Sequence, residues 1–282
     1  MLAGFVLSLR EGLEGALIIG IVLAALKKTG RTDYFKYVWR GVAVAILFSL
    51  AAAWFLGWLG LRFEGRAEEI FEGSAMLLAA VLLTWMIFWM QRQAGSLKAS
   101  LEDGVEQAAR RETPGALTWL AFLAVGREGL ELALFLSAAS FVSSSLDSSL
   151  GAWTGLVIAF LIGWLIYRSS LQLKLGQFFL LVNTLLIFFA AGLVAHGVHE
   201  FNEAGIIPSI IEHIWDTNFF INEKQPLGQV LTSLFGYNAN PSLTEVFAYG
   251  LYFLVLARFW KAMKQGIERG RSPGEGIPVI FE

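Results

Sequence analysis

Residues 2–26 read LAGFVLSLREGLEGALIIGIVLAAL, an apolar stretch interrupted by the charged sequence Arg-Glu-Gly-Leu-Glu at 10–14. The stretch is long enough for a helix that crosses the hydrocarbon core of a bilayer, which takes about 20 residues. A charged side chain at the bilayer centre costs about 2.5–3.5 kcal/mol on insertion scales, and such residues usually mark an ion or substrate pathway. The stretch therefore predicts a membrane helix with functional charges.

The same five residues occur again at 127–131, inside the apolar stretch 115–140. Residues three and four positions apart lie on one face of a helix, so the arginine and both glutamates of each motif can share one side. Two such motifs in two membrane helices indicate the two halves of one intramembrane site. Its predicted transport and metal-binding residues are Glu11, Glu14, Glu128 and Glu131, and its predicted counter-charges are Arg10 and Arg127.

The composition is typical of a membrane protein. Of the 282 residues 56% are hydrophobic, with 23 Phe and 10 Trp. The absence of cysteine excludes disulfides, thiolate metal sites and iron–sulfur clusters within this sequence. Ser242 and Glu245 have the spacing of a capping box, which marks the start of the last apolar stretch. We expect an all-α, polytopic membrane protein with seven transmembrane helices, near residues 3–26, 38–61, 70–90, 115–140, 151–168, 177–199 and 244–262.

Basic residues are concentrated in alternate loops, which predicts the orientation of the chain. Loops 27–40, 91–114 and 168–174 and the segment after 257 hold most of the 21 Lys and Arg residues. Because such residues stay on the cytoplasmic side, the N-terminus is expected outside and the C-terminus in the cytoplasm. The apolar spacing within 94–113 predicts a short amphipathic helix on the cytoplasmic surface.

This orientation makes the two motif helices antiparallel. We expect residues 1–92 and 113–200 to form two inverted three-helix repeats with the site near the midplane, a recurrent transporter design. An outer loop at 200–242, a seventh span at 243–263 and a cytoplasmic tail at 264–282 would complete a single transmembrane permease domain.

The chemistry of the motifs narrows the ligand. Four carboxylates and two guanidiniums leave an excess of negative charge, which favours a cation. Carboxylate oxygens suit hard ions such as Fe³⁺, Mn²⁺, Mg²⁺ and Ca²⁺, and the lack of cysteine argues against copper. A guanidinium has no lone pair for a metal, so the arginines are expected to position the carboxylates. The alternative is that each Arg–Glu pair is a structural salt bridge that fixes helix packing.

A second set of acidic and histidine side chains is expected at the outer ends of two spans. Acidic residues there raise the local concentration of cations, although the helix dipole also favours acids at a helix start. Within 196–203, His and Glu recur three and four residues apart, a spacing that suits a metal ion as well as an interfacial role. The predicted outer metal-receiving residues are Glu68, Glu69, Glu72, His196, His199, Glu200 and Glu203.

The doubled motif resembles the oxidase-coupled high-affinity iron permease family, which includes fungal iron permeases and bacterial EfeU-type permeases. Three further stretches are similar to that family: LLTWMIFWM at 82–90, GVHEF at 197–201 and LYFL at 251–254. The acidic Asp-Ala-Ser-Glu element of the fungal members does not occur in this sequence.

The resemblance implies a permease, not an enzyme, that imports iron through the motif glutamates. It also implies a separate extracytoplasmic partner, an oxidase that converts Fe²⁺ to Fe³⁺ or an iron-binding protein. Iron is then the transported substrate and no cofactor is permanently bound. The expected location is a bacterial inner membrane, with lipid as a partner and no nucleic acid.

Two other functions would use the same residues. A proton- or sodium-coupled carrier of another hard cation would use the carboxylates as a relay. An intramembrane metalloenzyme would hold a redox metal with the carboxylates, His196 and His199. Di-metal helical enzymes use Glu-x-x-His spacing, and no such spacing occurs in a predicted span.

Overall fold

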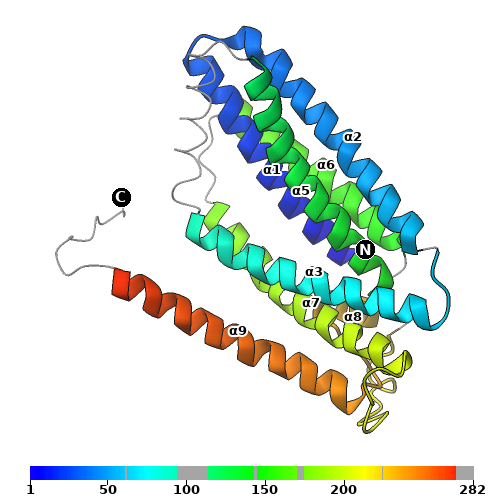
Figure 1. Ribbon diagram of the computed structural model, residues 1–282. Helices are drawn as coiled ribbons and strands as arrows, with labels where there is room; N and C mark the ends of the chain where they lie inside the picture. Colours follow the sequence, from blue (N-terminus) through cyan, green and yellow to red (C-terminus); the bar gives the residue numbers. More distant parts are fainter. Residues whose placement is uncertain (61, 94–113, 143–144, 170–174, 224, 271–282) are drawn as a thin grey trace.

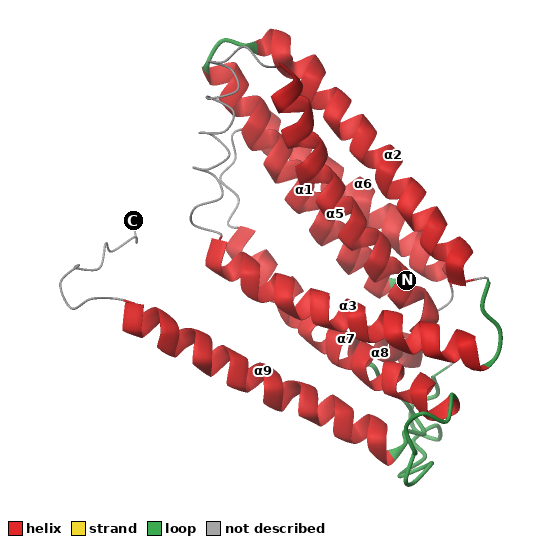
Figure 2. Cartoon of the chain, in the orientation of Figure 1, coloured by secondary structure: helices red, strands yellow, loops and turns green. Residues whose placement is uncertain are grey.

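The computed structural model describes residues 1–60, 62–93, 114–142, 145–169, 175–223 and 225–270. All regular secondary structure in these residues is helical, which confirms the all-α prediction (Figure 2). The predicted amphipathic helix at 94–113 lies outside the described residues. The helices are α1 (Leu2–Lys28), η1 (Thr32–Tyr34), α2 (Phe35–Gly60), α3 (Arg66–Gln93), α5 (Pro114–Val142), α6 (Ser145–Ser169), α7 (Leu175–Glu203), α8 (Pro226–Phe235) and α9 (Leu243–Gly270).

The long helices coincide with the apolar stretches of the sequence. The two motif helices, α1 and α5, have 27 and 29 residues, and each carries the three charges of its motif. Both exceed the length of about 20 residues that a bilayer requires. In the described part of the chain, five helical stretches are long and apolar enough to cross a membrane: Thr32–Gly60, Arg66–Met90, Leu146–Leu165, Gln177–Glu203 and Leu243–Ala262.

The helices form two groups, as Figure 1 shows. In the first group α1 packs along α6 and α2 packs along α5, and α1 also contacts α5. In the second group α3 packs along α7, and α9 packs against α7. Contacts of α3 with α5 and of α1 with α7 join the groups. The two motif helices therefore lie side by side, with α3 against one of them.

Apolar side chains are distributed as lipid surroundings require. The largest buried cluster includes Leu7 of α1, Leu83 of α3, Phe135 of α5 and Leu193 of α7. Many other large apolar side chains are exposed at the surface of the chain, among them Leu47, Trp54, Trp153, Phe160, Phe247 and Leu254. Exposed apolar patches of this extent are rare on soluble monomers and mark contact with a membrane or a partner.

Glycines allow a close contact between two helices of the second group, α3 and α7. A Cβ on Gly73 of α3 would lie 2.9 Å from the carbonyl oxygen of Gly197 of α7. A Cβ on Gly197 would lie 3.1 Å from the carbonyl oxygen of Gly73. Lipid tails are as apolar as side chains, so membrane helices associate through such close backbone packing.

The predicted outer loop at 200–242 contains α8, a helix that the sequence analysis does not predict. Its proline stands in the first turn, where a missing N–H group is tolerated. Gly236 ends the helix at φ 66°, the left-handed conformation that favours glycine. Gly236 also lies against Gly192 of α7. A Cβ on Gly192 would lie 2.6 Å from the Cα of Gly236, and a Cβ on Gly236 would overlap the Cα of Gly192. The loop is thus fixed to α7.

The start of α9 is a capping box, as its sequence predicts. The Ser242 N–H donates to Glu245 Oε1 at 3.1 Å, and the Glu245 N–H donates to Ser242 Oγ at 3.3 Å. Further along, Thr84 Oγ1 and Tyr252 Oη lie 2.9 Å apart and tie α9 to α3. The helix continues to Gly270, so the predicted tail at 264–282 begins as helix.

Candidate functional site

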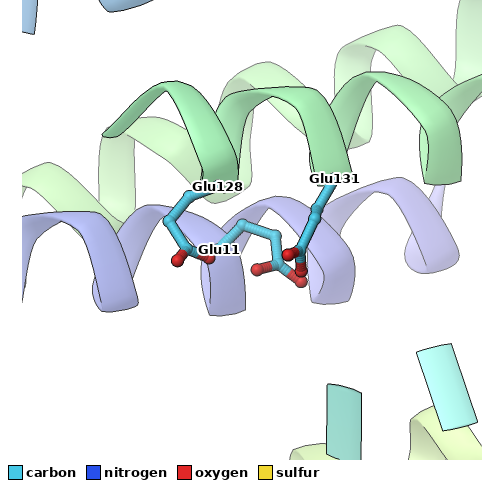
Figure 3. A group of neighbouring side chains, drawn as sticks. All are labelled: Glu11, Glu128 and Glu131. Carbon is cyan, nitrogen blue, oxygen red and sulfur yellow. The ribbon is translucent and has the colours of Figure 1, made fainter. Parts of the chain in front are cut away.

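The motif glutamates meet between α1 and α5. Figure 3 shows Glu128 and Glu131 reaching from α5 toward Glu11 of α1. One carboxylate oxygen from each of the three residues lies within 4.8 Å of the other two. Glu11 and Glu128 are 2% and 8% exposed and therefore buried, and Glu131 is partly buried. The chain thus brings together three of the four predicted metal-binding glutamates, and we call them the carboxylate cluster.

The fourth predicted glutamate, Glu14, belongs to an ion-pair group around Arg10. Arg10 is completely buried, with Nη1 at 2.7 Å from Glu11 Oε1 and Nη2 at 3.2 Å from Glu14 Oε1. One guanidinium therefore contacts both glutamates of its own motif. Arg10 thus lies where a counter-charge to Glu11 and Glu14 would lie, and its role stays a prediction.

The second motif is arranged differently. Arg127 Nε lies 2.8 Å from Glu131 Oε1, and the side chain of Arg127 is 37% exposed. Its guanidinium carbon lies 4.1 Å from the centre of the Trp89 ring, a cation–π contact with α3. Two motifs with the same sequence therefore have unequal surroundings: one arginine is buried and holds two carboxylates, and the other is partly exposed and holds one.

Two methionines of α3 complete the surroundings of Arg10. Nη1 donates to Met86 Sδ at 3.2 Å, and Nη2 donates to Met90 Sδ at 3.0 Å. Reasoning from sequence missed these two residues and Trp89 as site residues, although the stretch that contains them was noted for its family resemblance. A thioether counts as apolar in any hydropathy pattern, and only the contact with a guanidinium reveals its role as an acceptor.

Several carboxylate oxygens of the site lack a partner. Within the described residues, Oε2 of Glu11, Glu128 and Glu131 is buried and accepts no hydrogen bond. An unpartnered buried polar group costs about 1–3 kcal/mol, more if it is charged. A bound cation would remove this penalty at all three oxygens. The donor set, hard oxygen atoms from three carboxylates, fits a di- or trivalent hard cation.

The motif glycines serve helix packing. A Cβ on Gly12 would lie 2.7 Å from the Cβ of Ala159 on α6, and a Cβ on Gly129 would overlap Ser49 Oγ on α2. The small residue between the two carboxylates of each motif thus admits a neighbouring helix. Each motif helix is thereby held against a helix from the other half of the chain.

The predicted outer residues lie on two neighbouring helices. Glu68 is exposed in the first turn of α3, and Glu69 and Glu72 are partly buried there. On α7, Glu200 is placed beside the start of α3, because its Cβ would lie 3.1 Å from a Cβ on Gly73. Among the described residues, these side chains do not form a group of three ligand atoms as close as the carboxylate cluster.

The outer histidines differ in their contacts. His199 lies between two carboxylates, with Nδ1 at 3.0 Å from Glu245 Oε1 and Nε2 at 3.4 Å from Glu203 Oε1. Buried Nε2 of His196 has no hydrogen-bond partner within the described residues. Glu245 also accepts from Asn238 Nδ2 at 2.8 Å. The sequence analysis identifies Glu245 only as a cap, and its role as the partner of His199 follows from the contact of α9 with α7.

Long apolar helices around a buried cluster of carboxylates and guanidiniums define an integral membrane protein with a polar site inside its helix bundle. The chain belongs to the Iron permease FTR1 family, whose sequence pattern matches residues 1–264. This confirms the family resemblance that the doubled motif indicates.

Curated relatives agree over almost the full length. The Ferrous iron permease EfeU of Escherichia coli O157:H7 is 34% identical over 275 residues, which cover 96% of this chain and 100% of the relative. The protein of the same name from Yersinia pestis is 36% identical over 256 residues, which cover 90% of this chain and 91% of the relative. No solved structure matches the chain.

Proposed function

We propose that the protein imports iron across a membrane through the carboxylate cluster between α1 and α5. The observation that supports this proposal is the convergence of three carboxylates, two buried and one partly buried, each with a buried oxygen that lacks a partner within the described residues. The family and the relatives named as ferrous iron permeases support iron as the substrate. The protein acts as a permease and catalyses no chemical conversion of the ion.

The cluster sits in the middle of an inverted repeat. The proposed repeats are residues 1–92, with α1, α2 and α3, and residues 113–200, with α5, α6 and α7; α9 is the added seventh span. The pairing of α1 with α6 and of α2 with α5 supports this layout, because the first helix of each repeat packs on the second helix of the other. A pseudo-twofold axis in the membrane plane requires this exchange.

The repeat places the site near the membrane midplane. The contacts of Gly12 with α6 and of Gly129 with α2 support the same axis, since they are equivalent under it. We propose the N-terminus outside and the C-terminus in the cytoplasm, as the distribution of basic residues indicates. A bacterial inner membrane agrees with the enterobacterial source of the relatives.

Charge balance explains how such a site releases its ion. The four motif glutamates attract the cation, and the two arginines offset part of their charge, so that binding stays weak enough for release. When an ion binds, the nearby guanidiniums are repelled and must move or exchange partners. Permanent binding is therefore not expected, and the ion is a substrate.

The oxidation state is part of the proposal. A separate extracytoplasmic oxidase would supply Fe³⁺ from Fe²⁺, and the hard carboxylate oxygens suit Fe³⁺. The names of the relatives agree with Fe²⁺ as the form that the cell is offered. Direct import of Fe²⁺ is the second candidate, and those same names favour it.

Radioactive iron uptake into proteoliposomes tests the proposal. Wild type, Glu128→Gln and Glu131→Gln would be compared, with Fe²⁺ under reductant and with chelated Fe³⁺. Glu212→Gln, an exposed glutamate outside the site, is the matched control. Uptake by wild type and by the control, lost in both cluster variants, supports the proposal, and the preferred ion decides the oxidation state. Equal uptake by all four proteins contradicts it.

A further inference from the structure

Three side chains of α3 contact the motif arginines: two of them contact Arg10 and one contacts Arg127. Met86 and Met90 accept from Nη1 and Nη2 of Arg10 at 3.2 and 3.0 Å, and the ring of Trp89 faces the guanidinium of Arg127 at 4.1 Å. Their spacing, three and four residues from the first, places them on one face of the helix. We call Met86, Trp89 and Met90 the α3 cradle.

The α3 cradle gives the guanidiniums of Arg10 and Arg127 neutral partners in addition to the carboxylates that they contact. A guanidinium has five N–H donors and no acceptor, so a buried arginine requires several acceptors. Arg10 is completely buried, and its Nε already lacks a partner within the described residues. Were α3 purely hydrocarbon here, only carboxylates would remain as acceptors for these donors, and the nearest ones shown are those of Glu11, a member of the carboxylate cluster, and Glu14.

Thioethers and an indole ring suit this task. A thioether sulfur is a weak, polarisable acceptor, and an aromatic face attracts a guanidinium without carrying a charge. Such partners do not bind a hard cation in competition with carboxylate oxygen. They also release the guanidinium easily when an arriving ion repels it.

We propose that the α3 cradle positions Arg10 and Arg127 and thereby sets the affinity of the carboxylate cluster for iron. The cradle holds both guanidiniums on the α3 side, so that oxygens of Glu11, Glu128 and Glu131 stay open for the ion. This inference rests on the proposed function, since it assigns a role to these residues in the same iron site. Met86, Trp89 and Met90 are positioning residues that do not touch the ion.

Paired substitutions test the sulfur atoms. Met86→Leu with Met90→Leu keeps the size and apolar character of the side chains and removes both acceptors. We expect the KM for iron uptake to rise about tenfold, the ratio expected for one hydrogen bond to a charged group, with the maximal rate changed less than about twofold. Met86→Gln with Met90→Gln restores a side-chain acceptor, and we expect the KM to return toward the wild-type value.

The matched control is Met76→Leu. Met76 lies on the same helix, is 1% exposed and belongs to the apolar core. Its substitution by leucine reports the effect of losing a buried methionine from α3, and we expect no change in KM. Size-exclusion profiles and thermal unfolding of the purified variants establish that each one is folded.

A single variant covers the case in which the double variant does not fold. Trp89→Leu removes the aromatic partner of Arg127 alone, and we expect the KM to rise, whereas Trp89→Phe keeps an aromatic face and a near wild-type KM. A wild-type KM in Trp89→Leu and in the double variant Met86→Leu with Met90→Leu overturns the role of the α3 cradle and leaves the proposed function intact. A rise in the KM of Met76→Leu equal to that of the double variant does the same. Absence of iron uptake by the wild type overturns the proposed function and this inference together.

Discussion

Glu11 and Glu128, the corresponding first glutamates of the two motifs, face each other across the contact of α1 with α5, with carboxylate oxygens within 4.8 Å. Two buried carboxylates at this separation repel each other unless a cation or a proton lies between them. Glu131 adds a third carboxylate, and Arg10 contacts Glu11. The three carboxylates therefore form a site at which a cation or a proton is stabilised.

Separate loss of each of the two carboxylates of the first motif distinguishes direct from indirect roles. In Glu11→Gln an oxygen of the carboxylate cluster becomes neutral, and we expect iron uptake to fall about tenfold or more. Glu14 contacts Arg10 and lies outside the cluster, so Glu14→Gln acts through the arginine and is expected to have the smaller effect. Initial rates of uptake over a range of iron concentrations give both values. A larger loss in Glu14→Gln would mean that Glu14 is the ligand.

The unequal arginines predict unequal sensitivity to lysine. Arg10 has contacts with two carboxylates and two sulfur atoms, which a single ammonium group cannot reproduce. Arg127 has one carboxylate and an aromatic face as partners, and lysine can serve both. We expect Arg10→Lys to lower uptake and thermal stability more than Arg127→Lys. Equal losses in the two variants would show that the asymmetry between the motifs has no consequence.

A comparison of alanine at Gly12 with alanine at Gly20 separates two effects on stability: a clash in the packing of α1 against α6, and the general effect of a methyl group in a helix. A Cβ on Gly12 would lie 2.7 Å from Ala159, so we expect Gly12→Ala to destabilise the protein by about 1–3 kcal/mol. A Cβ on Gly20 of the same helix meets no atom within 4 Å. Gly20→Ala is therefore the control, and we expect it to be neutral or stabilising by about 0.5–1 kcal/mol. Thermal unfolding in detergent measures both, and a stable Gly12→Ala variant would rule out tight α1–α6 packing.

The contacts of Glu245, among them that with His199, predict a structural role for this glutamate. This glutamate accepts from His199, Asn238 and the Ser242 N–H, whereas the one side-chain contact of Glu203 within the described residues is with His199. We expect Glu245→Gln to lower the unfolding temperature more than Glu203→Gln, since hydrogen bonds to a charged group contribute about 1.5–3 kcal/mol each. If both variants instead keep wild-type stability and raise the KM for iron, the outer residues receive the metal.

The sequence predicts which segments are helical and which glutamates lie together in the site. It predicts the contacts between the helices less well. The repeated charges in two apolar stretches predict that Glu11, Glu128 and Glu131 lie together, because charged side chains of membrane helices face the interior of the bundle and pair with one another. The positions of the long helices follow from apolar length, but not all of their ends do: α6 begins at Ser145, before the predicted span 151–168, and α9 continues to Gly270, beyond the predicted span 244–262. The short helix α8 has no such signal, since its ten residues lie in a segment of mixed polarity.

Contacts between helices depend on rotation and tilt, which the spacing of residues in a single helix does not fix. The separation of Glu14 from the carboxylate cluster and the inequality of Arg10 and Arg127 are consequences of such rotation. The same holds for Met86, Trp89 and Met90, whose side chains are apolar by any hydropathy pattern. Their placement opposite the arginines is visible only when α3 is packed against the motif helices.

Location of the ion itself tests the central claim most directly. Crystals of the purified protein loaded with iron would give anomalous difference density at the iron absorption edge. The account predicts one principal peak between Glu11, Glu128 and Glu131, absent from crystals of Glu128→Gln prepared in the same way. A principal peak beside His196 and His199, or a peak unchanged by Glu128→Gln, would contradict a path through the carboxylate cluster.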